Sequence, residues 1–260
     1  MNDNTLTDYS QLLFHQTLRN RASTSARFGG SDTEELFEKN CVNAGTRAEL
    51  EYFGWLERDF SYRFNAQGYR CDEFDTRESF VALGCSFTEG VGVPEDETWP
   101  AFLSKQLGLH GWNLGIGGSS PMSVCRNLEP AIRLLRPQFV AILMPPRARV
   151  DVIGKDGFSD TYSPMHTKDT YLFHAKLTSS FLKNWFVNTE NADLQHKMAM
   201  NYCFQVAKDY SVPLVLLDGE ETRSILMFTR DKARDLMHDG PKTNAAISKI
   251  FYQQIQSLGV

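Results

Sequence analysis

The sequence predicts an α/β protein built on a parallel sheet that helices cover on both faces. Short, uninterrupted apolar runs recur from residue 79 onward, as expected of strands buried on both sides. Segments with apolar residues at helical spacing separate these runs, and glycine or proline residues mark their ends. With 42% hydrophobic and 23% charged residues, the composition is ordinary for a globular protein, and 12% aromatic residues exclude disorder along the whole chain.

Residues 1–78 are predicted to form an N-terminal extension that packs on the main domain. They are polar and rich in charge, so they would make a poor core of their own. The pattern Ser31-Asp32-Thr33-Glu34 is typical of a capping box and predicts a short helix through Phe37. An aromatic run from Leu50 to Tyr69 follows, with a turn at residues 65–68.

Residues 79–260 are predicted to form the main domain, in which strands alternate with helices. Apolar runs predict strands at residues 80–83, 112–114, 139–144 and 212–217. Helical spacing predicts helices near residues 99–107, 125–135, 192–210 and 241–258, the last starting at Pro241. Residues 147–188 lack a clear period and are predicted to be an insertion. Its aromatic residues would either pack together locally or line a substrate cleft.

In a sheet of this kind, ligands bind at the carboxyl ends of the strands. Polar residues follow the predicted strands at these ends. Ser86 lies just after the first strand, between Gly84 and Gly90, and a glycine-rich loop at residues 115–120 follows the second. Near the C-terminus, Asp235 and His238 are three residues apart and can meet across one turn. Each pattern alone is typical of an ordinary turn or helix cap. Their joint placement favours a nucleophilic Ser–His–Asp triad.

At these residues the sequence resembles the SGNH (GDSL-type) hydrolase family. The family's first block corresponds to Gly84-Cys85-Ser86, with cysteine in the usual aspartate position. The second block, Asn-x-Gly-x-x-Gly, matches residues 113–118, and the last block, Asp-x-x-His followed by Gly or Pro, matches residues 235–241. The resemblance spans residues 79–258.

The resemblance implies a flavodoxin-like three-layer α/β/α sandwich and assigns roles to individual residues. Ser86 is expected to be the nucleophile, His238 the general base and Asp235 its orienting partner. The backbone N–H groups of Ser86 and Gly118 are expected to form the oxyanion hole. The family's third block supplies an Asn as a further oxyanion donor, but residues 144–149 contain none. Arg147 is predicted to replace it, and Arg149 is predicted to bind substrate.

The function expected from this resemblance is a serine esterase that cleaves short-chain carboxylic esters, such as O-acetyl groups on carbohydrate. Two alternatives stay open: a catalytically weak or inactive glycan-binding or virion-associated module, and an acyltransferase to sugar. No cofactor is expected. No metal site is expected either, because the histidines outside the triad lack zinc-like spacing. The oligomeric state is not determined by the sequence.

Net charge and hydropathy limit the classes of binding partner and the cellular compartment that we expect for this protein. The 27 basic and 32 acidic residues give a formal net charge of −5, which argues against binding nucleic acid through bulk charge. No apolar stretch approaches the ~18 residues of a membrane span, and the first residues lack signal-peptide features. Five scattered cysteines without a CxxC pair indicate reduced thiols. A cytoplasmic protein is therefore expected, with virion association left open.

Overall fold

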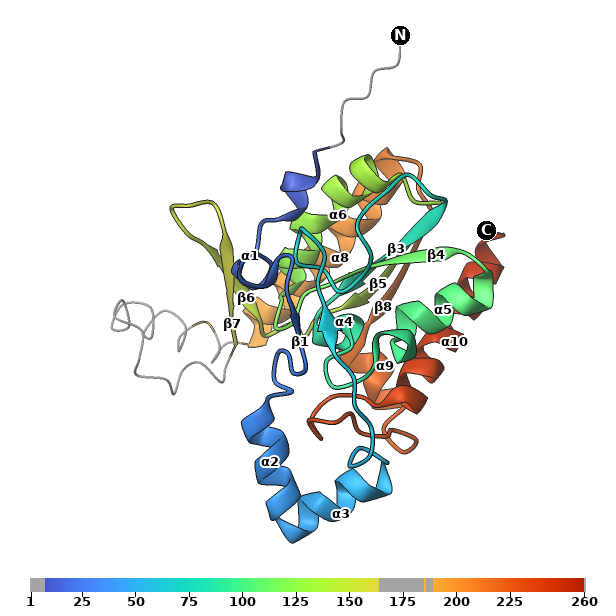
Figure 1. Ribbon diagram of the computed structural model, residues 1–260. Helices are drawn as coiled ribbons and strands as arrows, with labels where there is room; N and C mark the ends of the chain where they lie inside the picture. The colour runs from blue at the N-terminus through green and yellow to red at the C-terminus, as the bar shows by residue number, and fades with distance from the viewer. Residues whose placement is uncertain (1–7, 164–184, 186–188, 260) are drawn as a thin grey trace.

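A four-stranded parallel sheet forms the centre of the molecule, with strand order β4-β3-β5-β8 (Figure 1). The computed structural model describes residues 8–163, 185 and 189–259. All four predicted strands are present, as β3 (Ser79–Gly84), β4 (His110–Gly115), β5 (Val140–Met144) and β8 (Leu214–Asp218). The register pairs Gly84 with both Gly115 and Leu143, so the carboxyl ends of three strands lie level. The predicted parallel sheet is confirmed.

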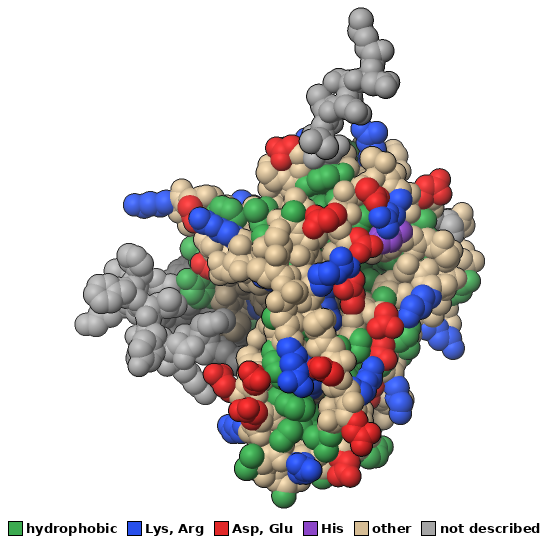
Figure 2. All heavy atoms as spheres, in the orientation of Figure 1, with side chains coloured by type: hydrophobic (Ala, Val, Ile, Leu, Met, Phe, Trp, Pro, Cys, Tyr) green, Lys and Arg blue, Asp and Glu red, His purple; other side chains and the backbone are tan. Residues whose placement is uncertain are grey.

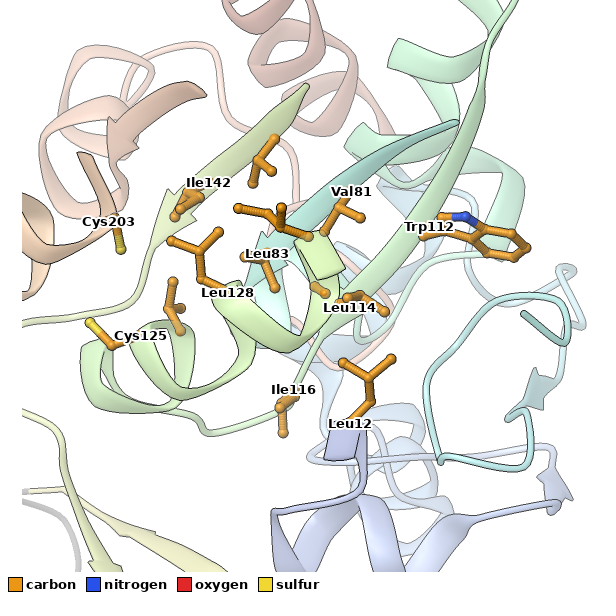
Figure 3. Close-up of a cluster of buried hydrophobic side chains, with 14 of the residues drawn as sticks. Leu12, Val81, Leu83, Trp112, Leu114, Ile116, Cys125, Leu128, Ile142 and Cys203 are labelled. Carbon is orange, nitrogen blue, oxygen red and sulfur yellow. The ribbon is translucent and has the colours of Figure 1, made fainter. Parts of the chain in front are cut away.

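Helices cover both faces of this sheet, which gives three layers. On one face lie α5 (Trp99–Leu107) and α10 (Pro241–Leu258), and on the other lie α6 (Pro121–Leu135) and α8 (Thr189–Asp209). Successive β3 residues alternate between the two cores, as the pleat requires. Phe80 and Ala82 pack with α5 and α10, while Val81 and Leu83 pack with α6 and α8 (Figure 3). The strand is therefore buried on both sides.

The N-terminal segment packs against the same core. Its elements are η1 (Tyr9–Leu12), α1 (Gln16–Arg21), β1 (Ser25–Ala26), α2 (Glu34–Val42), α3 (Ala44–Tyr52) and β2 (Tyr62–Arg63). Leu12, Leu18 and Tyr69 are fully buried in the cluster that contains Val81 and Trp112. β1 and β2 pair antiparallel, and α2 and α3 lie together beyond them, at the bottom of the view in Figure 1.

Two local predictions differ from the structure. The helix predicted from a cap at Ser31 begins at Glu34 instead, and Thr33 caps it by accepting a hydrogen bond from the Leu36 N–H at 3.1 Å. Part of the predicted insertion forms an antiparallel hairpin of β6 (Val150–Ile153) and β7 (Ser159–Tyr162). Most of its aromatic residues fall in 164–184 and 186–188, outside the described residues.

The remaining described elements are short: α4 (Ser86–Glu89), η2 (Glu95–Glu97) and α9 (Gly219–Ile225). Basic and acidic side chains are interspersed on the face of the molecule in Figure 2. Within the described part of the chain, each helix is too short or too polar to cross a membrane.

Candidate active site

Close packing at the carboxyl ends of β3 and β4 presents Ser86 at the edge of the sheet. The chain leaves β3 at Gly84 and enters α4 at Ser86. A Cβ atom at Gly84 would lie 2.1 Å from the Thr88 hydroxyl, and one at Gly115 would lie 2.2 Å from the Glu89 backbone nitrogen. Since real side chains do not tolerate such contacts, only glycine at both positions lets α4 sit directly on the strand ends.

The three side chains predicted to form a triad lie in a continuous chain of hydrogen bonds. His238 Nε2 lies 2.8 Å from Ser86 Oγ, and His238 Nδ1 lies 2.6 Å from Asp235 Oδ2. The Asp235 side chain is fully buried, whereas that of His238 is 14% exposed. The structure therefore brings the three predicted side chains together. It is the arrangement in which an imidazole can accept a serine proton while a carboxylate holds the opposite ring nitrogen.

The carboxylate of Asp235 is held by the backbone of its own loop. Asp235 Oδ1 accepts hydrogen bonds from the N–H groups of Met237 at 3.0 Å and His238 at 2.9 Å. Burial raises the pKa of Asp235, but the hydrogen bonds and charge of His238 outweigh burial and hold this pKa below its ordinary value. Leu236 adopts a left-handed backbone conformation with φ of 58°, which is strained for a leucine.

Ser86 and His238 border a cavity of about 790 Å³. One wall comes from the glycine loop after β4, and another comes from the N-terminal segment. Hydroxyl, amide and charged side chains are frequent in the lining, with two aromatic rings among them: Thr17, Asn20, Arg21, Thr24, Phe28, Ser31, Phe64, Arg149, Asp160 and Thr161. The N-terminal segment thus forms part of the candidate site. No sequence pattern in residues 1–78 predicted this contribution.

The glycine loop is fixed by buried polar contacts. The Gly117 N–H donates to Glu89 Oε2 at 2.5 Å, and Arg21 donates to Glu89 Oε1 at 2.8 Å. The Asn113 side chain donates to the Thr88 carbonyl at 2.8 Å, which ties β4 to α4. Gly118, predicted to supply an oxyanion donor, follows in this loop and lines the cavity with Ser86.

The two arginines after β5 differ in position. Arg147 does not take the oxyanion position predicted for it. It pairs with Asp193 at 2.8 Å and Glu220 at 2.6 Å, because these carboxylates lie beside it at the protein surface. Arg149 does line the cavity, where it donates to the Ser119 carbonyl at 3.0 Å.

Three residues in or beside the site were missed by sequence reasoning: Ser31, Glu89 and Arg21. Glu89 lies three residues after Ser86, and no local pattern in the sequence indicates its complete burial beside a glycine loop. His196 pairs with Asp218 at 2.9 Å. Within the described residues, no group of three or more His, Cys, Asp or Glu side chains is placed to hold a metal ion.

Comparisons with known proteins give structural neighbours only. No protein-family model and no curated protein matches the sequence. Solved structures that resemble the chain include the psychrotrophic esterase EstA from Pseudoalteromonas sp., with 16% identity over 70% of this chain and 98% of that one, at a TM-score of 0.37.

A member of the lipolytic G-D-S-L family from Veillonella parvula is 12% identical over 66% of this chain and 94% of its own, at a TM-score of 0.35. A carbohydrate esterase family 2 enzyme from Corynascus thermopiles is 13% identical over 77% of this chain and 72% of its own, at 0.38. Proteins named as esterases or as G-D-S-L lipolytic proteins therefore recur among the structural neighbours.

Proposed function

We propose that this protein is a serine ester hydrolase of the SGNH type. The observation that carries the proposal is the hydrogen-bonded chain from Ser86 through His238 to Asp235, at the edge of a cavity. A serine hydroxyl is a weak nucleophile on its own, and an adjacent base in this geometry activates it. The backbone hydrogen bonds to Asp235 and its contact with His238 outweigh the cost of burial and favour a fixed, ionised partner for the imidazole.

In the proposed reaction, His238 Nε2 accepts the proton of Ser86 while Oγ attacks the ester carbonyl carbon. The carbonyl oxygen becomes an oxyanion, which the backbone N–H groups of Ser86 and Gly118 stabilise. The tetrahedral intermediate collapses, and the leaving alkoxide takes the proton from His238 and departs as an alcohol. Water then loses a proton to His238 and attacks the acyl-serine carbonyl carbon. The second tetrahedral intermediate breaks its bond to Ser86 Oγ, which takes the proton back from His238, and a carboxylic acid is released.

The cavity lining supports a short acyl group on a polar alcohol, such as an O-acetyl group on carbohydrate. Hydroxyl, amide and charged groups can hydrogen-bond a polyol, and the half-buried Phe28 ring borders the cavity beside them. A long acyl chain would gain about 0.8 kcal/mol per methylene only in an apolar channel. The wall formed by the N-terminal segment mixes polar side chains with Ala26 and Phe28 and contains no long apolar run, so we expect short chains to react faster.

An ester panel tests the proposal. Wild type, Ser86→Ala and the exposed control Ser25→Ala are assayed on nitrophenyl esters from acetyl to long acyl and on an O-acetylated carbohydrate. We expect turnover by wild type and Ser25→Ala, highest for acetyl, and none by Ser86→Ala. Equal turnover in Ser86→Ala would contradict the proposed nucleophile, and faster turnover of long-chain esters would contradict the proposed substrate class.

A further inference from the structure

A serine of the N-terminal segment contacts the Asp–His pair. Ser31 Oγ donates a hydrogen bond to Asp235 Oδ2 at 2.8 Å and lies 3.4 Å from His238 Nδ1. It therefore reaches the same carboxylate oxygen that His238 Nδ1 contacts. More than 200 residues separate Ser31 from this pair along the chain, so only the fold brings them together.

The hydroxyl of Ser31 has no capping role that would explain its position. Thr33 caps α2, whereas the Ser31 side chain turns toward the Asp235 loop. A tight turn fixes the backbone around Ser31, since Gly29 and Asp32 exchange N–H to carbonyl hydrogen bonds at 2.9 and 3.2 Å. The side chain is thus presented to Asp235 from an ordered turn.

The residue after Ser31 anchors this turn to the Asp235 loop. Arg234 donates to both carboxylate oxygens of Asp32, with Nε 3.1 Å from each and Nη2 2.7 Å from Oδ2. The Tyr62 hydroxyl donates to Asp32 Oδ2 at 2.7 Å. Two consecutive residues of the N-terminal segment therefore hold two consecutive residues of the loop: Ser31 holds Asp235, and Asp32 holds Arg234.

We propose that Ser31 is a positioning residue for the Asp235–His238 pair, an inference that rests on the proposed function. With Ser31 in place, Asp235 Oδ2 receives two donors and Oδ1 receives two backbone N–H groups. The carboxylate cannot rotate without breaking several of these bonds. The imidazole plane is fixed in turn, which keeps His238 Nε2 directed at Ser86.

Kinetics of Ser31→Ala, Ser31→Thr and the exposed control Ser25→Ala test this inference on the best ester. We expect kcat of Ser31→Ala to fall about 10- to 100-fold, as for a lost hydrogen bond to a charged group, with KM within about twofold of wild type. Ser31→Thr keeps the hydroxyl and should recover most of the rate. Because Ser31 also borders the cavity, a rise in KM at unchanged kcat would identify a substrate contact and overturn the positioning role.

Two further measurements separate this inference from the proposed function. The His238 Nδ1–H proton resonance, followed by NMR, should move in Ser31→Ala and stay in place in Ser25→Ala, whether or not an ester is turned over. An unchanged resonance in Ser31→Ala would overturn the contact. If instead the resonance moves but wild-type Ser86 reacts with no ester and no fluorophosphonate, the proposed function fails and the positioning role fails with it, although the contact stands. Thermal unfolding of Ser31→Ala near that of wild type shows that lost kcat is not lost folding.

Discussion

Replacing Asp32 by alanine should destabilise the protein strongly, because it leaves the Arg234 guanidinium buried without its carboxylate. The side chains of Asp32 and Arg234 are each 1% exposed. Arg234 would keep a hydrogen bond from Nη2 to the Arg27 carbonyl at 2.8 Å and its place over the Phe60 ring. Neither contact neutralises its charge, so the loss is that of a broken buried ion pair.

Breaking such a pair by removing one partner costs about 3–5 kcal/mol. For a chain of this size, each kcal/mol shifts the unfolding midpoint by roughly 2–4 °C, so Asp32→Ala should unfold roughly 6–20 °C below wild type. The matched control is Asp59→Ala. Asp59 pairs with Arg27 at the surface, where the side chains are 70% and 59% exposed. Exposed pairs contribute about 0–1 kcal/mol, so this control should shift the midpoint by less than about 4 °C.

Scanning calorimetry of the wild type and both variants, in one buffer, measures the two shifts. Because Asp32 also anchors the turn that carries Ser31, the proposed esterase activity should fall in Asp32→Ala even at temperatures where the variant stays folded. A midpoint of Asp32→Ala that lies less than about 4 °C below wild type would refute the reasoning, because the buried pair would then be no more important than an exposed one.

Two further predictions concern the site. Arg149→Ala should raise KM about tenfold or more over wild type, because Arg149 lines the cavity. Arg147→Ala should leave KM within about twofold of wild type, because the partners of Arg147 lie outside the cavity lining. Similar KM values for the two variants would contradict this prediction. The lowered pKa of Asp235 means that its carboxylate stabilises the fold above the ordinary aspartate pKa of about 3.9 and loses this effect as pH falls through the lower folded value. The difference in unfolding free energy between wild type and Asp235→Asn should therefore be constant near neutrality and shrink below about pH 4. Urea titrations of both proteins across this pH range measure the difference. A difference that grows on acidification would contradict the prediction.

Much of the sheet and the hydrogen-bonded arrangement of Ser86, His238 and Asp235 could be predicted from the sequence because both depend on local patterns. Apolar runs define β3, β4, β5 and β8, and parallel strands bring their carboxyl ends to one edge. Ser86 comes two residues after the end of β3. Asp235 and His238 lie in a single loop before α10, so the fold has only to bring this one loop to the strand ends for the three side chains to meet. The start of α10 at Pro241 was predictable for a similar reason, since proline suits the first helical position.

Long-range polar contacts could not be predicted in this way. Ser31 precedes a helix and looks like its cap, yet its hydroxyl binds a carboxylate on a distant loop. Arg147 follows β5 where an oxyanion donor was expected, but Asp193 and Glu220 attract it toward the surface from distant positions in the chain. The β6–β7 hairpin has strands of only four residues each, too short for a clear alternating pattern.

Covalent labelling tests most directly whether Ser86 is an activated nucleophile. Wild type, Ser86→Ala, His238→Ala and Ser25→Ala are each incubated with a fluorophosphonate, and the intact mass and the labelled peptide are determined by mass spectrometry. The proposed triad predicts one label on Ser86 in wild type and Ser25→Ala, none in Ser86→Ala, and labelling slowed by about 100-fold or more in His238→Ala, as for loss of a general base. A wild-type protein that stays unlabelled, or a label that persists in Ser86→Ala, would contradict it.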